Sequence, residues 1–208
     1  MDHITLLCIG VLLLGLLSTA NAALESRLGS LAVYDTDLNI TWLANANAGA
    51  GSSFDTIHWG EPFETTDGLM YTVDALAWAA SFNMGGVSGW RLSTTDEMSH
   101  LFYNELGGVV GSSILSSSDP DLALFTNIQP SGYVSSTYFP PTPDFPQALW
   151  GVFNFGNGFQ DLAGDVLWIN YAWAVHDGDV AAIPEPEMYA MMVLGLAVLL
   201  GFGRLRQH

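Results

Sequence analysis

The stretch that most constrains the structure of this chain is its C-terminal end, Ile183–His208. In it a short, stiff segment, here called the hinge, precedes a long apolar run. The hinge consists of Pro184, Glu185 and Pro186. Proline fixes its own φ and disfavours helical geometry in the residue before it, so two prolines around one residue keep the backbone extended. The hinge therefore separates the polypeptide that folds before it from the apolar run behind it.

The apolar run contains no charged residue between Glu187 and Arg204. As an α-helix that rises about 1.5 Å per residue, residues 188–205 would be about 27 Å long, which is close to the roughly 30 Å hydrocarbon core of a bilayer. The sequence thus predicts a transmembrane helix at about 188–205. The positive-inside rule places Arg204 and Arg206, at its end, in the cytoplasm.

The order of these parts resembles the PEP-CTERM sorting signal of Gram-negative bacteria, in which a Pro-Glu-Pro motif precedes a hydrophobic helix and an arginine-containing end. The resemblance covers residues 183–208. It implies that an exosortase-type membrane protease recognises the tail and cuts near the motif. The exported domain would then pass from a transient membrane anchor to the cell surface or extracellular matrix. A plain single-pass anchor that stays uncut is the alternative.

The N-terminal end predicts export as well. Residues 1–22 contain a long apolar core followed by the sequence Ala20-Asn21-Ala22. This small-residue pattern after an apolar region is typical of a secretory signal peptide. We therefore expect a signal peptide at 1–22 and a mature N-terminus at Ala23, with an uncleaved anchor as the alternative.

The charge between the two ends limits the partners of the domain. Residues 23–183 contain eighteen acidic side chains against Arg27 and Arg91 and no lysine, which gives a net charge of −16. Such a surface repels nucleic acid, which requires a basic footprint, and repels anionic polysaccharide unless a divalent cation bridges the two. The single cysteine, Cys8, falls in the signal peptide, so the mature chain would lack disulfides and thiolate nucleophiles.

Residues 31–182 are expected to form one α+β domain, with two helices and an antiparallel sheet, behind a short linker at 23–30. Hydrophobic patterns and turn residues predict strands at 31–35, 40–43, 90–92, 133–139, 149–155, 159–162 and 168–176. A first helix is predicted at 71–82, within the segment 67–82, which has Leu69, Val73, Leu76, Ala77 and Ala80 on helical spacing. A second helix at 95–106 begins at a capping box of Thr94 and Glu97 and is expected to bury Met98, Leu101, Phe102 and Leu106.

Four sequence blocks follow one another in this domain: Ile40–Leu43, Gly89–Glu97, Tyr133–Thr137 and Ala172–Asp179. Their order resembles the Lcl C-terminal domain family, which consists of exported bacterial domains with a C-type-lectin-like fold. The resemblance covers roughly residues 31–180 and implies that fold for this chain. Where the family pattern has a proline, a tryptophan and an arginine, this chain has Ser93, Val134 and His176.

Two residues of the second block are candidates for a ligand site or an ion pair. Trp90 is expected to be a core aromatic, with stacking on a sugar as the alternative. Arg91 lies between Trp90 and Leu92, and a half-buried guanidinium requires a carboxylate partner. The candidate partners are Asp177, Asp179 and Glu97.

A candidate metal site lies in the predicted turn that contains Asp35, Asp37 and Asn39. Oxygens at every second residue of a turn suit a hard cation such as Ca²⁺, and Asp177 and Asp179 have the same spacing. Solvated turn carboxylates are the alternative, and the sequence predicts no other cofactor.

Sequence motifs for catalysis are missing: the chain has neither a G-x-S-x-G elbow nor an H-E-x-x-H helix. His58, His100 and His176 are too scattered in the sequence to predict a zinc site. We therefore expect a non-enzymatic binding or extracellular-matrix module, associated with exopolysaccharide in a biofilm. The alternatives are a membrane-anchored periplasmic scaffold and an exported enzyme that uses carboxylates.

Overall fold

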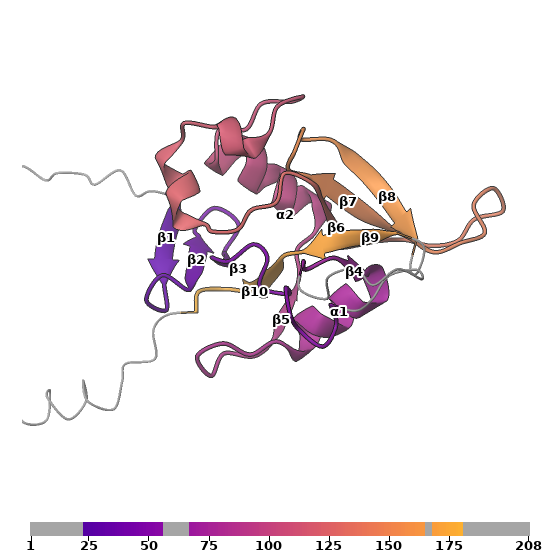
Figure 1. The fold of residues 1–208 in the computed structure, drawn as a ribbon, viewed down its shortest axis with the longest axis horizontal. Helices are drawn as coiled ribbons and strands as arrows, with labels where there is room; N and C mark the ends of the chain where they lie inside the picture. The colour runs from indigo at the N-terminus through magenta and orange to yellow at the C-terminus, as the bar shows by residue number, and fades with distance from the viewer. Residues whose placement is uncertain (1–22, 56–66, 165–167, 181–208) are drawn as a thin grey trace, which may run out of the picture.

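The computed structural model describes residues 23–55, 67–164 and 168–180, and within them the chain has an α+β fold (Figure 1). One antiparallel sheet has the strand order β1 (Leu24–Arg27), β2 (Ala32–Asp35), β3 (Ile40–Leu43), β10 (Ala174–Asp177) and β5 (Trp90–Leu92). The other has the order β4 (Met70–Tyr71), β9 (Ile169–Ala172), β6 (Gly132–Phe139), β7 (Leu149–Asn154) and β8 (Gln160–Gly164), and its β6–β9 pair is parallel. The α+β class is confirmed, but the expectation of one antiparallel sheet is wrong, because the strands form two sheets and β10 returns to pair with the early strands β3 and β5.

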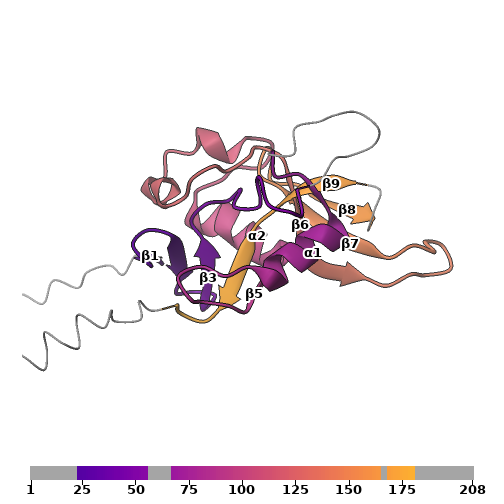
Figure 2. The same ribbon diagram turned by 60° about the horizontal axis from the view of Figure 1, so that its bottom comes forward.

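The helices are α1 (Thr72–Ser81) and α2 (Thr95–His100). A π-helical turn, η1 (Leu101–Glu105), continues α2 directly, and two short 3₁₀ turns follow, η2 (Ile114–Ser116) and η3 (Pro120–Leu124). Figure 2 shows both α-helices packed beside the sheets. Helix α1 contacts β4, β5, β6 and β9, and α2 contacts β6 and β7.

Segment 23–30 is not the linker that the sequence predicts, because it contains strand β1. Leu24 is buried and pairs with Asp35, and Arg27 pairs with Ala32 at the other end of the strand. The backbone N–H of Thr36 donates to the carbonyl of Ala23 over 2.8 Å. One buried leucine in four residues is too weak a pattern to predict an edge strand. Strand β1 is stabilised by its pairing with β2, which the local sequence does not show.

Helix α1 has the predicted range but presents a different face to the core. Val73, which the predicted stripe includes, is 41% exposed. The indole of Trp78 packs against Phe82 with ring centroids 5.4 Å apart, and the Thr72 hydroxyl donates to the carbonyl of Gly164. The bulky Trp78 and this hydrogen bond therefore decide the orientation, so that the buried residues are Thr72, Ala75, Trp78 and Ala79.

The start of α2 confirms the predicted capping box. The Thr94 hydroxyl accepts from the Glu97 amide over 3.1 Å, while the Glu97 carboxylate accepts from the Thr94 amide over 2.7 Å. The helix changes character after His100: the Leu106 amide donates to the carbonyl of Leu101, five residues back. The predicted apolar face of this helix is nevertheless confirmed, since Met98, Leu101, Phe102 and Leu106 are all fully buried.

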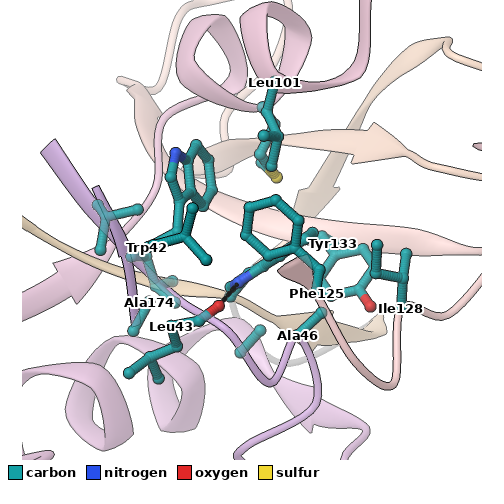
Figure 3. Close-up of a cluster of buried hydrophobic side chains, with 14 of the residues drawn as sticks. Trp42, Leu43, Ala46, Leu101, Phe125, Ile128, Tyr133 and Ala174 are labelled. Atoms are coloured by element: carbon teal, nitrogen blue, oxygen red, sulfur yellow. Dashed lines mark hydrogen bonds between the residues drawn. The ribbon is translucent and has the colours of Figure 1, made fainter. Parts of the chain in front are cut away.

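The segment expected as one last strand is divided at Trp173, which separates β9 in one sheet from β10 in the other. The Trp173 indole N–H donates to the carbonyl of Leu43 over 2.8 Å, and its ring lies 5.3 Å from those of Trp42 and Phe125. Trp42, Phe125 and Tyr133 belong to the buried cluster drawn in Figure 3. One buried tryptophan thus joins the two sheets through a shared aromatic core.

None of the helices in the described ranges has the length and the apolar character needed to cross a bilayer. The predicted signal peptide at 1–22 and the predicted sorting tail at 183–208 lie outside the described residues. The sorting residues Pro184, Glu185, Pro186, Arg204 and Arg206 therefore remain predictions from sequence.

Candidate functional site

Arg91 on β5 lies at the centre of an ion-pair network. Its guanidinium holds both carboxylate oxygens of Glu97, at 2.7 and 3.0 Å, in a bidentate arrangement. It also donates to Asp177 Oδ1 from two nitrogens, at 2.6 and 3.0 Å. These hydrogen bonds, those that Glu97 accepts foremost, raise the pKa of Arg91. Two of the three predicted partners are present, and the network fastens the start of α2 to the end of β10.

The third predicted partner, Asp179, pairs with Arg27 instead. Its two oxygens accept from Arg27 at 2.7 and 3.0 Å, and Glu25 accepts from the same guanidinium at 2.6 Å. This contact joins β1, at the start of the described chain, to the residues just after β10, at its end. Both ends of the domain therefore lie at the same side of the molecule, on the left in Figures 1 and 2.

Trp90 does not offer a surface for stacking on a sugar. Its residue is 2% exposed, and the indole N–H donates to the carbonyl of Val87 over 3.0 Å. The ring packs edge-on against Phe82 and His176. Its role as a core aromatic is confirmed, and Trp173 and Phe155 are fully buried as well.

The predicted turn at Asp35–Asn39 forms, with Asn39 in the left-handed region at φ 52°. Asp35 Oδ1 accepts from the amides of Asp37 and Leu38 at 3.1 and 3.0 Å, which closes the turn. Asn39 Oδ1 accepts from the Tyr34 hydroxyl at 2.8 Å. Two of the oxygens expected to ligate Ca²⁺ thus already have partners within the chain.

A group of exposed or half-buried apolar side chains lies at the opposite end of the domain, around the loop that joins β6 and β7. We call it the aromatic groove and define it by Phe139, Phe145, Leu149, Leu162 and Trp168. Phe145 is 66% exposed and Trp168 is 60% exposed. Two adjoining cavities of about 460 and 250 Å³ share Phe145, Leu149 and Leu162 in their linings.

Strand register explains why these side chains share one face. Phe139 lies opposite Leu149, and Leu149 lies opposite Gly164, two residues from Leu162. Because side chains alternate along a strand, Phe139, Leu149 and Leu162 point to the same side of the sheet. The loop beyond them is stiffened by Pro140, Pro141, Pro143 and Pro146.

A tight turn in this loop presents the ring of Phe145. Thr142 and Phe145 exchange backbone hydrogen bonds at 2.8 and 3.1 Å, and the Thr142 hydroxyl accepts from the Phe145 amide as well. Two polar side chains, Asp144 and Gln147, line the larger cavity beside Phe145 and Trp168. Aromatic faces with a few polar groups at their margin are typical of small-ligand sites.

Another depression, of about 490 Å³, lies between η1 and η3 and is lined mainly by serine and glycine residues and Asp119. It presents no aromatic ring, so the aromatic groove is the stronger candidate for a binding site. The sequence alone does not reveal the groove, because Phe145 belongs to a proline-rich loop and the pattern at 168–176 predicts a strand that includes Trp168. The sequence signal that could have revealed Phe145 and Trp168 is their position beside turn residues. A large aromatic ring at such a position is not expected to be buried in the core.

Compared with known protein families, curated proteins and solved structures, the chain has no match.

Proposed function

We propose that this chain is an exported, surface-held binding module that presents the aromatic groove to neutral polysaccharide of the extracellular matrix. The observation that carries the proposal is the placement of the groove. It lies around the β6–β7 loop, on the right in Figures 1 and 2, whereas both ends of the domain lie at the opposite side. A sorting tail behind Val180 would therefore hold the domain with its groove directed away from the membrane.

The predicted export and surface localisation are the second part of the proposal. The signal peptide at 1–22 delivers the chain across the inner membrane, and the tail at 183–208 halts in the bilayer. An exosortase-type membrane protease then acts on Pro184–Pro186 and passes the domain to the cell surface or matrix. The domain itself does no chemistry in this proposal.

The arrangement of the four sequence blocks supports a C-type-lectin-like fold. The first block forms β3, the second contains β5 and the fourth contains β10, and these strands are neighbours in the order β3-β10-β5. The third block, in β6, is attached to them through the hydrogen bond from the Ser136 amide to the Ser93 carbonyl. Blocks that are far apart in the sequence thus form one connected unit.

Charge favours a neutral ligand over an anionic one. The arginines of the described residues, Arg27 and Arg91, are each held by two carboxylates, and lysine is absent from the chain. Asp144 adds a negative charge at the groove itself. An anionic polysaccharide would meet repulsion there, whereas the hydroxyls of a neutral sugar can donate to Asp144 and Gln147 while its ring stacks on Trp168.

Alanine substitutions in the groove test the binding proposal. Trp168→Ala and Phe145→Ala should each weaken binding to a neutral glucan by about tenfold, because a central aromatic contact contributes about 1–2 kcal/mol. Retention of the purified protein in native gels cast with the glucan measures the dissociation constant. Val109→Ala removes an equally exposed apolar side chain elsewhere on the surface and serves as the control. Equal retention of the Trp168→Ala, Phe145→Ala double variant and the parent would refute the proposal.

Mass spectrometry of the exported protein tests whether the signal peptide is cleaved. We expect the mature chain to begin at Ala23, because Ala20 and Ala22 occupy the small-residue positions of a cleavage site. Strand β1 begins only one residue later, at Leu24, so this cleavage leaves the folded edge intact. Recovery of exported protein that still begins at Met1 would refute cleavage.

A further inference from the structure

Three side chains that can ligate a metal converge where the β2–β3 turn meets the end of α2. Asp37, His100 and Glu105 each place one ligand atom within 4.8 Å of the other two. His100 Nε2 lies 2.9 Å from Glu105 Oε1. Asp37 is exposed, His100 is half-buried and Glu105 is buried, so the cluster opens to solvent on the side of Asp37.

The π-helical turn is what brings His100 and Glu105 together. In an α-helix two residues five apart differ by about 500° of rotation, which leaves their side chains about 140° apart around the axis. The wider η1 turn, closed by the hydrogen bond from Leu106 to Leu101, places position 105 nearly above position 100. Such insertions are rare in helices and occur frequently at functional sites.

A buried carboxylate oxygen without a partner supplies a second, independent observation. Asp35 is 0% exposed, and its Oδ2 has no hydrogen-bond partner, although its Oδ1 closes the turn that carries Asp37. The carboxylate of Asp35 lies beside the cluster, because its Oδ1 accepts from the backbone amide of Asp37 over 3.1 Å. A buried negative charge there is costly unless a cation or a donor balances it.

We propose that Asp37, His100 and Glu105 bind one divalent transition-metal ion of the Zn²⁺ class, with Asp35 as a nearby carboxylate that balances the charge of the ion. An imidazole nitrogen with two carboxylates is a donor set that Zn²⁺ accepts in proteins. Ligand atoms about 2.0–2.2 Å from the ion lie at most about 4.4 Å apart, so only a small movement of the exposed Asp37 side chain completes the site.

The site shares Asp37 with the Ca²⁺ turn that the sequence predicts but differs from it in chemistry, because its other two ligands, His100 and Glu105, come from α2 and η1. Ca²⁺ takes six to eight oxygen ligands, whereas here one donor is a nitrogen and Asn39 is occupied by Tyr34. The bound ion would have a structural role. It would fasten the β2–β3 turn, and with it the sheet that contains β2 and β3, to the α2–η1 segment. This inference does not depend on the groove or on what the groove binds.

Isothermal titration calorimetry of the full-length protein in detergent, produced without a histidine tag and stripped with chelator, tests the site. We expect Zn²⁺ to bind with one-to-one stoichiometry and to raise the melting temperature, because an ion that binds only the folded state stabilises it by mass action. Ca²⁺ at the same concentration should do neither. Co²⁺ should bind in place of Zn²⁺ and give the visible absorption bands of a four-coordinate ion.

Substitutions of the ligands separate this site from adventitious binding by other histidines and carboxylates. Asp37→Asn and His100→Gln should each weaken Zn²⁺ binding by more than the roughly 10–100-fold that loss of an outer partner costs. Asp37→Asn alters an exposed residue, so the variant is expected to fold even if His100→Gln does not. Asp96→Asn, on the exposed first turn of α2, is the matched control and should bind as the parent does. Absence of Zn²⁺ binding by the parent, or unchanged binding by Asp37→Asn, would overturn the proposal.

Discussion

Replacement of Trp173 by alanine is expected to lower the free energy of unfolding by about 3–5 kcal/mol, which is the range for a large buried aromatic. The indole is fully buried, and its N–H donates to the Leu43 carbonyl over 2.8 Å. The substitution leaves that carbonyl without its donor and opens a cavity between the two sheets. Urea denaturation followed by circular dichroism measures the change in the free energy of unfolding.

The effect should be larger than the area of one side chain suggests, because the Trp173 ring contacts four other rings from separate parts of the chain. Its centroid lies 5.3 Å from those of Trp42, Phe125 and Phe155, and 5.6 Å from that of Tyr133. Trp168→Ala, which removes the same side chain from a 60% exposed position five residues earlier, is the matched control and should change stability little. Equal stability losses in the two variants would show that the core is not organised around Trp173.

Local signals in the sequence were sufficient for the elements whose stabilisation is local. The capping box of Thr94 and Glu97 involves residues three apart, and both of its hydrogen bonds form. The turn at Asp35 closes through amides two and three residues ahead. In each case the chemistry that makes the structure is contained in a few consecutive residues.

Elements that depend on distant partners were predicted less well. Strand β1 exists because β2 pairs with it, and the face of α1 is chosen by Trp78 and by the bond from Thr72 to a carbonyl of β8. The break at Trp173 follows from the need of its ring and its N–H for partners in both sheets. Hydrophobic spacing within one segment contains none of this information.

The candidate sites, too, depend on partners that are distant in the sequence. The sequence places Arg91 near carboxylates, and the structure selects Glu97 and Asp177 while giving Asp179 to Arg27. The sequence alone does not mark His100 as a metal ligand, because no other histidine lies at a ligand spacing from it. Its partners Glu105 and Asp37 become neighbours only through the π-turn and the packing of the β2–β3 turn on α2, neither of which periodicity predicts.

Replacement of Pro184, Glu185 and Pro186 together by alanine is expected to abolish processing of the tail while membrane insertion persists. The change leaves residues 188–205 and both terminal arginines intact, so the segment predicted to span the bilayer retains its length and its terminal charge. The alanines permit a helix where two prolines enforce an extended chain, which removes the accessible strand that a protease requires. In a host that carries the exosortase, immunoblots of membrane and medium fractions should find the variant uncut in the membrane.

A single substitution beside the motif separates recognition of the motif from a general effect of altering the tail. Glu187→Ala removes one charge but keeps Pro-Glu-Pro, and this control should be processed as the parent is. In a host without the exosortase, the parent, the control and the triple variant should all remain in the membrane at the same apparent mass. Since the three proteins differ only near the hinge, cleavage of the parent and the control but not of the triple variant would assign recognition to Pro184–Pro186. Release of the triple variant at the parent's rate would instead show that the motif is not read and that the tail is a plain anchor or is clipped without specificity.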